Sequence, residues 1–369
     1  MTHRKFFSLL FIVCLVLSAC GDLTQTPPPV PDVTSTPSTE HTPIDLQVGY
    51  GVRGPWFELY FTDPADPLSS QGTGGVDGPL VEALDAARLS IDVAAYSLSL
   101  NSVRYALIRA HERGVTVRVV MESTNMDRSD PQALLEAGIP IVGDGRQGLM
   151  HNKFMVIDRS EVWLGTMNFT DSGAYDDNNQ MIRIQSEKIA ADFLQEFNEM
   201  FEDDSFGPDI KPQTPYPSVE IDGTRVDVYF SPDDGVLNAL GLLLGNAEES
   251  IYFLAFSFTS NELGSLVRQK HAAGLDVKGV MDEEQIASNT GTEFDPFRQK
   301  GVDVLIDGND GQMHHKIFII DEKIVAFGSY NFSKSAEENN DENLIVIYSP
   351  EIARQFVLEF ERVRSHAHQ

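Results

Sequence analysis

The sequence predicts an α/β protein made of two duplicated domains, each with a mixed, largely parallel sheet flanked by helices. Residues 148–170 and 311–333 share one pattern of His, Lys, Asp, Gly, Ser or Thr, and Asn at a constant offset of 163 residues. Residues 90–122 are echoed by residues 250–282 at an offset of 160 residues. With 41% hydrophobic and 22% charged residues, the chain can bury a core in each copy. We therefore expect a pseudo-twofold axis and a functional site at the domain interface.

The first 48 residues are expected to lie outside the folded domains. Basic residues, an apolar run over residues 6–17 and a small-residue site are the order of an export signal. The ending Leu-Ser-Ala-Cys resembles the lipobox of bacterial lipoproteins, which implies cleavage after residue 19 and a lipid on Cys20. An ordinary cleaved signal peptide and a membrane anchor are the alternatives. Residues 20–48, rich in Pro and Thr, predict an extended tether. We expect an exported protein, anchored to the cell envelope or secreted.

The remaining chain divides into an N-terminal domain of residues 49–205, a linker of residues 206–223 and a C-terminal domain of residues 224–369. The linker is rich in Pro and Gly and has little periodicity. In the first domain, periodicity predicts strands at residues 91–96, 115–121, 139–142, 153–157 and 162–164, and helices at residues 103–113, 131–137 and 187–201. The second domain repeats this order and closes with a helix over residues 352–363.

The duplicated motif brings together side chains that suit a phosphate group. Strand alternation puts the His and Lys of one motif on the same face and its Asp on the other. Lys supplies a positive charge, Asn supplies amide hydrogens, and imidazole supplies a nucleophile or a proton. Displacing an alcohol from a phosphodiester requires an attacking group on one side and an acid on the other. Two motifs that face each other across an axis would supply both.

The pattern resembles the paired HxKxxxxD motifs of the phospholipase D superfamily over about residues 49–363. The resemblance implies a phosphohistidine intermediate, with His151 as the nucleophile and His314 as the general acid, and no cofactor. It also implies four side chains that hold the nonbridging oxygens: Lys153, Lys316, Asn168 and Asn331. Four others are expected to be structural: Asp158, Asp321, Thr166 and Ser329. Removal of the expected signal would leave Cys20 as the only cysteine, no His-Glu-x-x-His pattern is present, and Lys beside each motif His disfavours a metal ion.

Members of this superfamily also carry a carboxylate after each motif that hydrogen-bonds the histidine. In the second copy this residue is Glu342, and the equivalent position of the first copy is Asn179. A shift of one or two residues would bring Asp177 into the same role. We expect Glu342 to serve His314 within its own copy, because a carboxylate raises the pKa of imidazole and favours an acid.

The sequence ranks the candidate substrate classes. The stretch NFSKSAEENNDEN resembles the short, nuclease-type branch of the superfamily, whereas the net charge of −29 disfavours a broad nucleic-acid surface. Together with the lipoprotein signal, the charge favours hydrolysis of a phospholipid headgroup. A secreted endonuclease ranks second and a phosphatidyl transferase third. A surface lipoprotein that only binds phosphate groups is the non-enzymatic alternative. We expect a monomer, because one chain carries both motifs.

Overall fold

The computed structural model describes residues 41–209 and 211–369, which belong to one compact unit. The expected export signal and the expected lipid site at Cys20 lie outside the described residues. None of the helices in the described part is long and apolar enough to cross a membrane.

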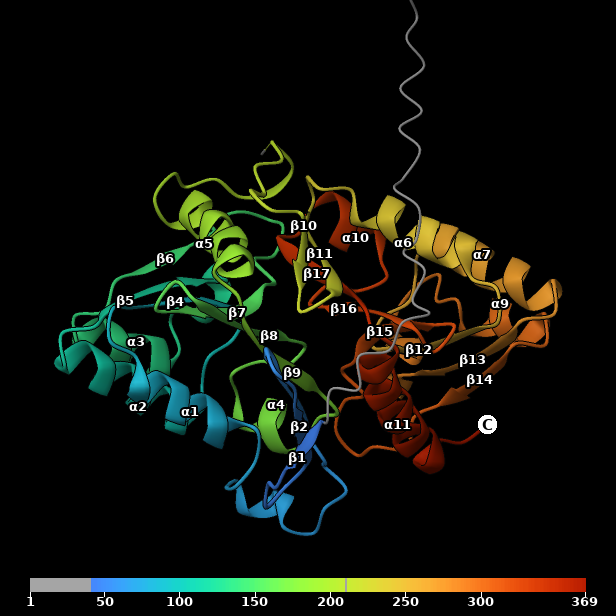
Figure 1. The fold of residues 1–369 in the computed structure, drawn as a ribbon, viewed down its shortest axis with the longest axis horizontal. Helices are drawn as coiled ribbons and strands as arrows, with labels where there is room; N and C mark the ends of the chain where they lie inside the picture. Colours follow the sequence, from blue (N-terminus) through green and yellow to red (C-terminus); the bar gives the residue numbers. More distant parts are fainter. Residues whose placement is uncertain (1–40, 210) are drawn as a thin grey trace, which may run out of the picture. The chain divides into compact units, whose positions relative to one another are not determined.

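The first half contains a nine-stranded sheet in the order β1-β2-β3-β9-β8-β7-β4-β5-β6. Its strands are β1 (Thr42–Ile44), β2 (Tyr50–Arg53), β3 (Phe57–Phe61), β4 (Ser90–Ala95), β5 (Thr116–Met121), β6 (Ile141–Gly143), β7 (Lys153–Ile157), β8 (Glu161–Gly165) and β9 (Gln180–Gln185). Its helices are α1 (Asp77–Ala86), α2 (Asn101–Glu112), α3 (Ser129–Glu136), α4 (Asp171–Tyr175) and α5 (Glu187–Phe201). Helices α1, α2 and α3 cover one face of the sheet and α5 lies on the other (Figure 1).

The second half contains an eight-stranded sheet in the order β10-β11-β17-β16-β15-β12-β13-β14. Its strands are β10 (Ser218–Ile221), β11 (Thr224–Ser231), β12 (Ser250–Ala255), β13 (Asp276–Met281), β14 (Asp303–Ile306), β15 (Lys316–Ile320), β16 (Ile324–Gly328) and β17 (Glu342–Tyr348). Its helices are α6 (Val236–Asn246), α7 (Asn261–Ala272), α8 (Glu283–Ser288), α9 (Phe294–Gln299), α10 (Lys334–Glu338) and α11 (Pro350–His366). From β3 and β11 onward the two strand orders match one for one, which confirms the predicted duplicated α/β fold.

The sheets are mixed, and parallel pairing is confined to β4-β5-β6 and β12-β13-β14. These are the strands joined by crossover helices, whereas the hairpins and the opposite edges, at β1 and β10, pair antiparallel. Two boundaries differ from the sequence-based expectation. Strand β1 lies within the expected tether and β10 lies within the expected linker. Both are short edge strands whose pairing partners, β2 and β11, are the next strands along the chain.

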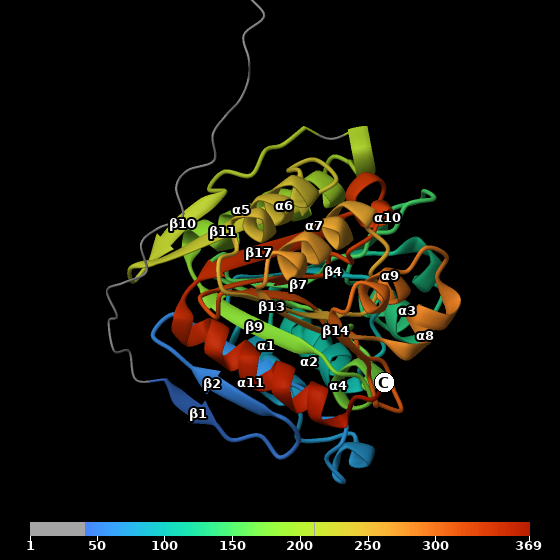
Figure 2. The ribbon, with the colours of Figure 1, turned by 90° about the vertical axis from the view of Figure 1, so that its right-hand side faces the viewer.

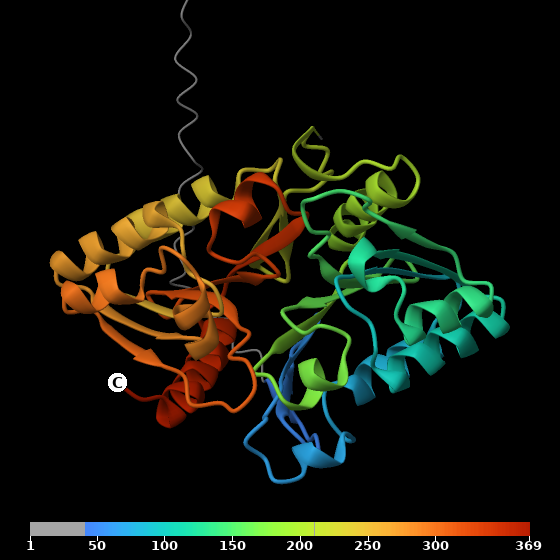
Figure 3. The same cartoon turned by 180° about the vertical axis from the view of Figure 1, so that it is seen from behind.

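The two halves share a central apolar core. It joins α5, α11 and the inner faces of both sheets. Phe193 of α5 packs against Phe230 of β11, and Phe61 of β3 packs against Phe356 of α11, with ring centroids 5.0 and 5.3 Å apart. Figure 2 shows α11 lying beside β2 of the first half, where Tyr50 donates a hydrogen bond to Glu359. This shared core fixes the two motif strands, β7 and β15, relative to each other; Figure 3 shows the junction from behind.

The motif aspartates, Asp158 and Asp321, stabilise the turn after each motif strand. Asp158 and Arg159, in the three-residue loop between β7 and β8, both have positive φ, 52° and 57°, which tight hairpin turns require at their central residues. The Asp158 carboxylate accepts hydrogen bonds from the backbone N–H groups of residues 88 and 89, just before β4, and of residue 90, the first residue of β4. Asp321 repeats both features at residues 248, 249 and 250. The arrangement agrees with the structural role expected for both residues.

Replacing Asp158 by Ala is expected to lower the free energy of unfolding by about 2 kcal/mol, because three backbone donors lose their acceptor and Ala disfavours positive φ. Urea unfolding measures this loss. Asp158→Asn keeps the turn preference and should lose less. Turnover of the folded variant should stay within about twofold, since the carboxylate lies at the far end of β7 from the motif histidine; a large fall in kcat with unchanged stability would contradict the structural role.

Candidate active site

The two motifs meet through reciprocal backbone hydrogen bonds between the halves. The N–H of His151 donates to the carbonyl of Asp341 at 2.9 Å, and the N–H of His314 donates to the carbonyl of Asn178 at 3.0 Å. Each acceptor residue returns a bond, at 2.8 Å, to the carbonyl two residues before the histidine. Residues 178 and 341 differ by the repeat offset of 163, so each contact has its mate across the pseudo-twofold axis. The start of each motif strand is therefore held by the opposite half.

The histidine and lysine side chains of both motifs are buried at this junction. Lys153 and Lys316 have no exposed surface, and His151 and His314 retain 7% and 3%. Each ammonium donates a hydrogen bond to the backbone carbonyl of its own histidine, at 2.7 and 2.8 Å. An ammonium has three N–H donors. The others can serve a ligand oxygen.

The side chains that hold the histidines come from the opposite half, which corrects the pairing expected from the sequence. The Nδ1 atom of His151 lies 2.7 Å from Oε2 of Glu342, and the Nδ1 atom of His314 lies 3.0 Å from Oδ1 of Asn179. The expected pairing of Glu342 with His314 is wrong because the axis places the end of one copy beside the start of the other. Asp177 does not take this role; its carboxylate accepts the N–H of Gln312.

The neighbours of Asn179 fix which atom faces His314. The amide Nδ2 donates to the carbonyl of Gly173 at 2.9 Å, and Oδ1 accepts from the hydroxyl of Thr166 at 2.8 Å. Oδ1 therefore faces His314, whose Nδ1 must carry the proton. The same tautomer follows for His151, because Glu342 is ionised and accepts. In both rings Nε2 is the atom left for a substrate. Ser329, the counterpart of Thr166, accepts from the N–H of Asn343 at 3.0 Å.

Asn168 follows β8, and Asn331 follows β16. The ends of these strands pair with the residues of β7 and β15 that come directly after Lys153 and Lys316. Both asparagines are half-exposed, and in each the Oδ1 atom is buried without a hydrogen-bond partner among the described residues. Two equivalent amides with unused hydrogen-bonding capacity suit a bound polar ligand. Their role in holding nonbridging oxygens remains a prediction.

Burial sets the charge state of the site. It lowers the pKa of His151 to about 4, although Glu342 opposes the shift. Burial, together with Lys316 and Lys153, holds the pKa of His314 well below its usual range. Burial also lowers the pKa of Lys153 to about 7 and that of Lys316 well below its usual value. Burial opposes ionisation of Glu342, but His151 and Lys153 hold the pKa of this carboxyl below its ordinary value. An arriving phosphodiester anion would favour the charged forms of both lysines.

The two histidines differ in their partners, and this difference predicts a pH effect. Asn179→Asp should raise the pKa of His314 and move the basic limb of kcat/KM upward by about 1–2 pH units, since a carboxylate stabilises imidazolium. The measurement is a pH profile with a phosphodiester substrate. Asn178→Asp is the matched control, because the Asn178 side chain contacts Arg362 rather than an imidazole. A limb that moves equally in both variants would contradict the assignment of His314 as the acid.

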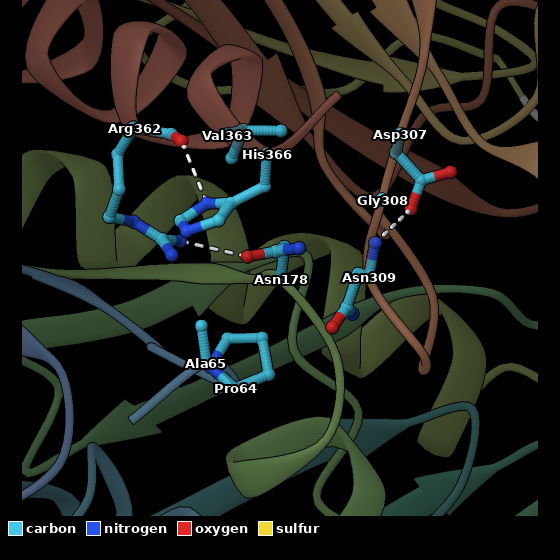
Figure 4. A pocket seen from close by; sticks show the side chains of 9 residues that line it. All are labelled: Pro64, Ala65, Asn178, Asp307, Gly308, Asn309, Arg362, Val363 and His366. Atoms are coloured by element: carbon cyan, nitrogen blue, oxygen red, sulfur yellow. Dashed lines mark hydrogen bonds between the residues drawn. The ribbon is translucent and has the colours of Figure 1, made fainter. Parts of the chain in front are cut away.

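A second buried network lies behind His314. His315 is fully buried, and its Nδ1 atom is hydrogen-bonded to Oε1 of Gln180. Its Nε2 atom lies 2.7 Å from Oε1 of Glu359, which also accepts a hydrogen bond from Arg362. Arg362 lines a small pocket of about 50 Å³ between the halves (Figure 4). None of the motif histidines or lysines lines this pocket. The sequence shows His315 next to the motif histidine His314, but nothing in the local pattern indicates the partners of His315, which lie 135 and 44 residues away.

Each half of the chain separately matches one and the same protein family. Residues 80–201 and 242–364 match the family described as "Cardiolipin synthase, PLD-like domain". The chain belongs to the phospholipase D-like domain family. One phospholipase D-like copy thus covers most of each half, and each copy holds one histidine-lysine motif. Within the described residues, no three His, Cys, Asp or Glu side chains are placed to hold a metal ion.

Individual relatives in this family match part of the chain. The mouse protein named "Mitochondrial cardiolipin hydrolase" is 36% identical over 117 residues, which is 32% of this chain and 52% of the relative. The Rickettsia conorii protein named "Phospholipase D" is 30% identical over 138 residues, 37% of this chain and 68% of the relative. The chain thus spans about half the length of the mouse relative. The phosphatidylserine synthase of Haemophilus influenzae shares the fold, with a TM-score of 0.61 at 12% identity over 80% of this chain and 86% of that chain.

Proposed function

We propose that this phospholipase D-like protein is a phosphodiesterase that hydrolyses a phospholipid to phosphatidate and an alcohol through a phosphohistidine. The observation that carries the proposal is the crossed pair of imidazoles, each held at Nδ1 by the opposite half, with Nε2 left for the substrate. Two imidazoles supplied by different halves can act on opposite sides of one phosphorus atom, which an in-line displacement requires.

In the first step Nε2 of His151 forms a bond to phosphorus while the bond from phosphorus to the leaving alcohol breaks. His314 enters this step as the imidazolium, with a proton on both ring nitrogens, and gives its Nε2 proton to that alcohol. In the second step His314 takes a proton from water, the oxygen attacks phosphorus, and His151 leaves. Glu342 stabilises the cationic imidazole of the intermediate, because it lies 2.7 Å from Nδ1. This assigns the carboxylate to the nucleophile, with the neutral amide of Asn179 serving the acid. Lys153 and Lys316 balance the charge on the nonbridging oxygens.

The phospholipid substrate is supported by two lines of argument. Curated relatives carry the names cardiolipin hydrolase and phospholipase D. Residues 1–19 resemble an export signal that precedes a lipidated Cys20, and the net charge of −29 repels nucleic acid. We propose that the protein is exported and held at a membrane by a lipid on Cys20. The nuclease-like stretch after Asn331 keeps a secreted endonuclease as the second candidate, ahead of a phosphatidyl transferase.

Turnover by the protein without residues 1–19 tests the proposal. Vesicles of phosphatidylcholine or phosphatidylglycerol and a single-stranded DNA are offered side by side, with the His151→Ala variant as the blank. Release of headgroup and phosphatidate supports the proposal. Cleavage of DNA at low salt in preference to lipid would replace it with the endonuclease, and transfer to an added alcohol without hydrolysis would replace it with the transferase. Phosphate binding without turnover of any substrate would indicate the non-enzymatic lipoprotein.

A further inference from the structure

Two aromatic residues at equivalent places in the repeat flank the motif side chains. Tyr96 follows β4 and Phe256 follows β12, at the 160-residue offset of those strands. Each backbone N–H extends the pairing with the motif strand, since Tyr96 donates to the carbonyl of Asn152 at 3.1 Å and Phe256 to that of His315 at 2.8 Å. The fold therefore places one ring beside each histidine-lysine pair.

Each ring contacts both functional groups of its own motif. The Tyr96 ring meets the His151 ring edge to face, with centroids 5.0 Å apart, and Nζ of Lys153 lies 5.0 Å from its centre. The Phe256 ring meets His314 at 4.7 Å, and Nζ of Lys316 lies 4.6 Å from its centre. The interplanar angles, 68° and 67°, are also alike. The geometry of the two contacts is thus the same in both halves.

These rings are not core residues. Both are half-buried, whereas the strand residues before them, Ala95 and Ala255, are fully buried. Neither ring belongs to any of the three apolar clusters formed by the described residues. Packing of the core therefore does not account for an aromatic side chain at these positions. The shared element is the ring and not the hydroxyl, since only Tyr96 has one.

The contacts explain how a buried ammonium can be kept in place. Each lysine is held by the carbonyl of its histidine on one side and by a ring face on another, so its remaining hydrogens are directed elsewhere. A cation over an aromatic face gains most when both are shielded from water. The charges that act on Lys316 are Lys153, Glu342, Asp282 and Asp177, and Glu342 acts on Lys153. The rings add attraction without adding a counter-charge that would compete with phosphate.

We propose that Tyr96 and Phe256 are positioning residues, each of which fixes the imidazole and the ammonium of its own motif and supports the charged lysine that receives the phosphate. The proposal deepens the proposed function and rests on it. It predicts that an aromatic ring is required at both positions, and that aliphatic residues of similar volume weaken the reaction without unfolding the protein.

Kinetics with bis(p-nitrophenyl) phosphate test this requirement. Tyr96→Leu and Phe256→Leu should each lower kcat/KM by about 10- to 30-fold, and Tyr96→Phe should stay within about twofold. Tyr105→Leu is the matched control, because its ring also lies under a cation, Arg104, but on the surface of α2. Unchanged kcat/KM in both folded leucine variants would overturn the proposal. Absence of activity in the wild-type protein would instead reject the proposed function.

A second measurement stays valid if a leucine variant does not fold. Incorporation of phenylalanines with one to five ring fluorines at position 256 keeps the shape and weakens the electrostatic attraction of the ring face. The pKa of Lys316, followed by NMR of its ε-carbon and assigned by the loss of its signal in Lys316→Met, should fall by up to about one unit along the series. A pKa of Lys316 that does not change with fluorination would overturn the proposal.

Discussion

The variant His151→Ala is expected to lose turnover of a phosphodiester by about 10⁴-fold or more, because the bond to phosphorus has no other nucleophile. His314→Ala should behave differently. With a p-nitrophenyl ester, whose leaving group needs no proton, it should release about one equivalent of p-nitrophenolate and then stall, since no base activates water for the second step. The stalled protein should carry an acid-labile phosphoryl adduct on His151, which intact-mass measurement at neutral pH detects.

The crossed hydrogen bonds give the two histidines different partners, so the two variants show which histidine is the nucleophile. If the adduct instead forms in His151→Ala and lies on His314, the carboxylate of Glu342 serves the acid and the roles are reversed. His111→Ala, on α2 and away from both motifs, is the control for the loss of an imidazole in general. Its turnover should match that of the wild-type protein.

The sequence contained enough information to predict the duplicated fold and the motif side chains, because both depend on local patterns. Strand alternation separates Lys153 from Asp158, and the structure shows the lysine at the junction and the aspartate at the turn after β7. The repeat offset also identified Glu342 and Asn179 as equivalent residues. Equivalence does not reveal which histidine each one contacts. That choice depends on how the halves dock, and a twofold arrangement exchanges the partners.

Other features of the site required the fold as well. Tyr96 and Phe256 are equivalent residues of the two copies. From periodicity alone, each is predicted only to end a buried strand. The contact of each ring with a lysine arises only when β4 pairs with β7 and β12 with β15. The partner of His315 comes from α11, 44 residues further along the chain. Spacing within a motif cannot predict such contacts.

Replacing Lys153 by Met is expected to abolish detectable turnover and at the same time to stabilise the unliganded protein. Burial lowers the pKa of this lysine from 10.5 to about 7. Between these two values the unfolded chain binds the proton that the folded protein lacks, so the free energy of unfolding rises with pH across this window. The destabilisation by Lys153 is therefore fully present below about pH 7 and fades toward pH 10. Met fills a similar volume and has no charge to desolvate.

The gain should be about 2 kcal/mol at pH 6.5, after the lost hydrogen bond to the carbonyl of His151 is subtracted, and it should shrink toward zero near pH 10. Urea unfolding at both pH values measures it. Lys323→Met is the matched control, because this lysine is exposed and paired with Glu249, and it should change neither stability by much nor turnover. A stabilisation independent of pH would mean that packing rather than the buried charge is responsible. If the added stability of Lys153→Met decreases as pH rises and turnover is lost, the buried charge of Lys153 is required for turnover and lowers the stability of the protein.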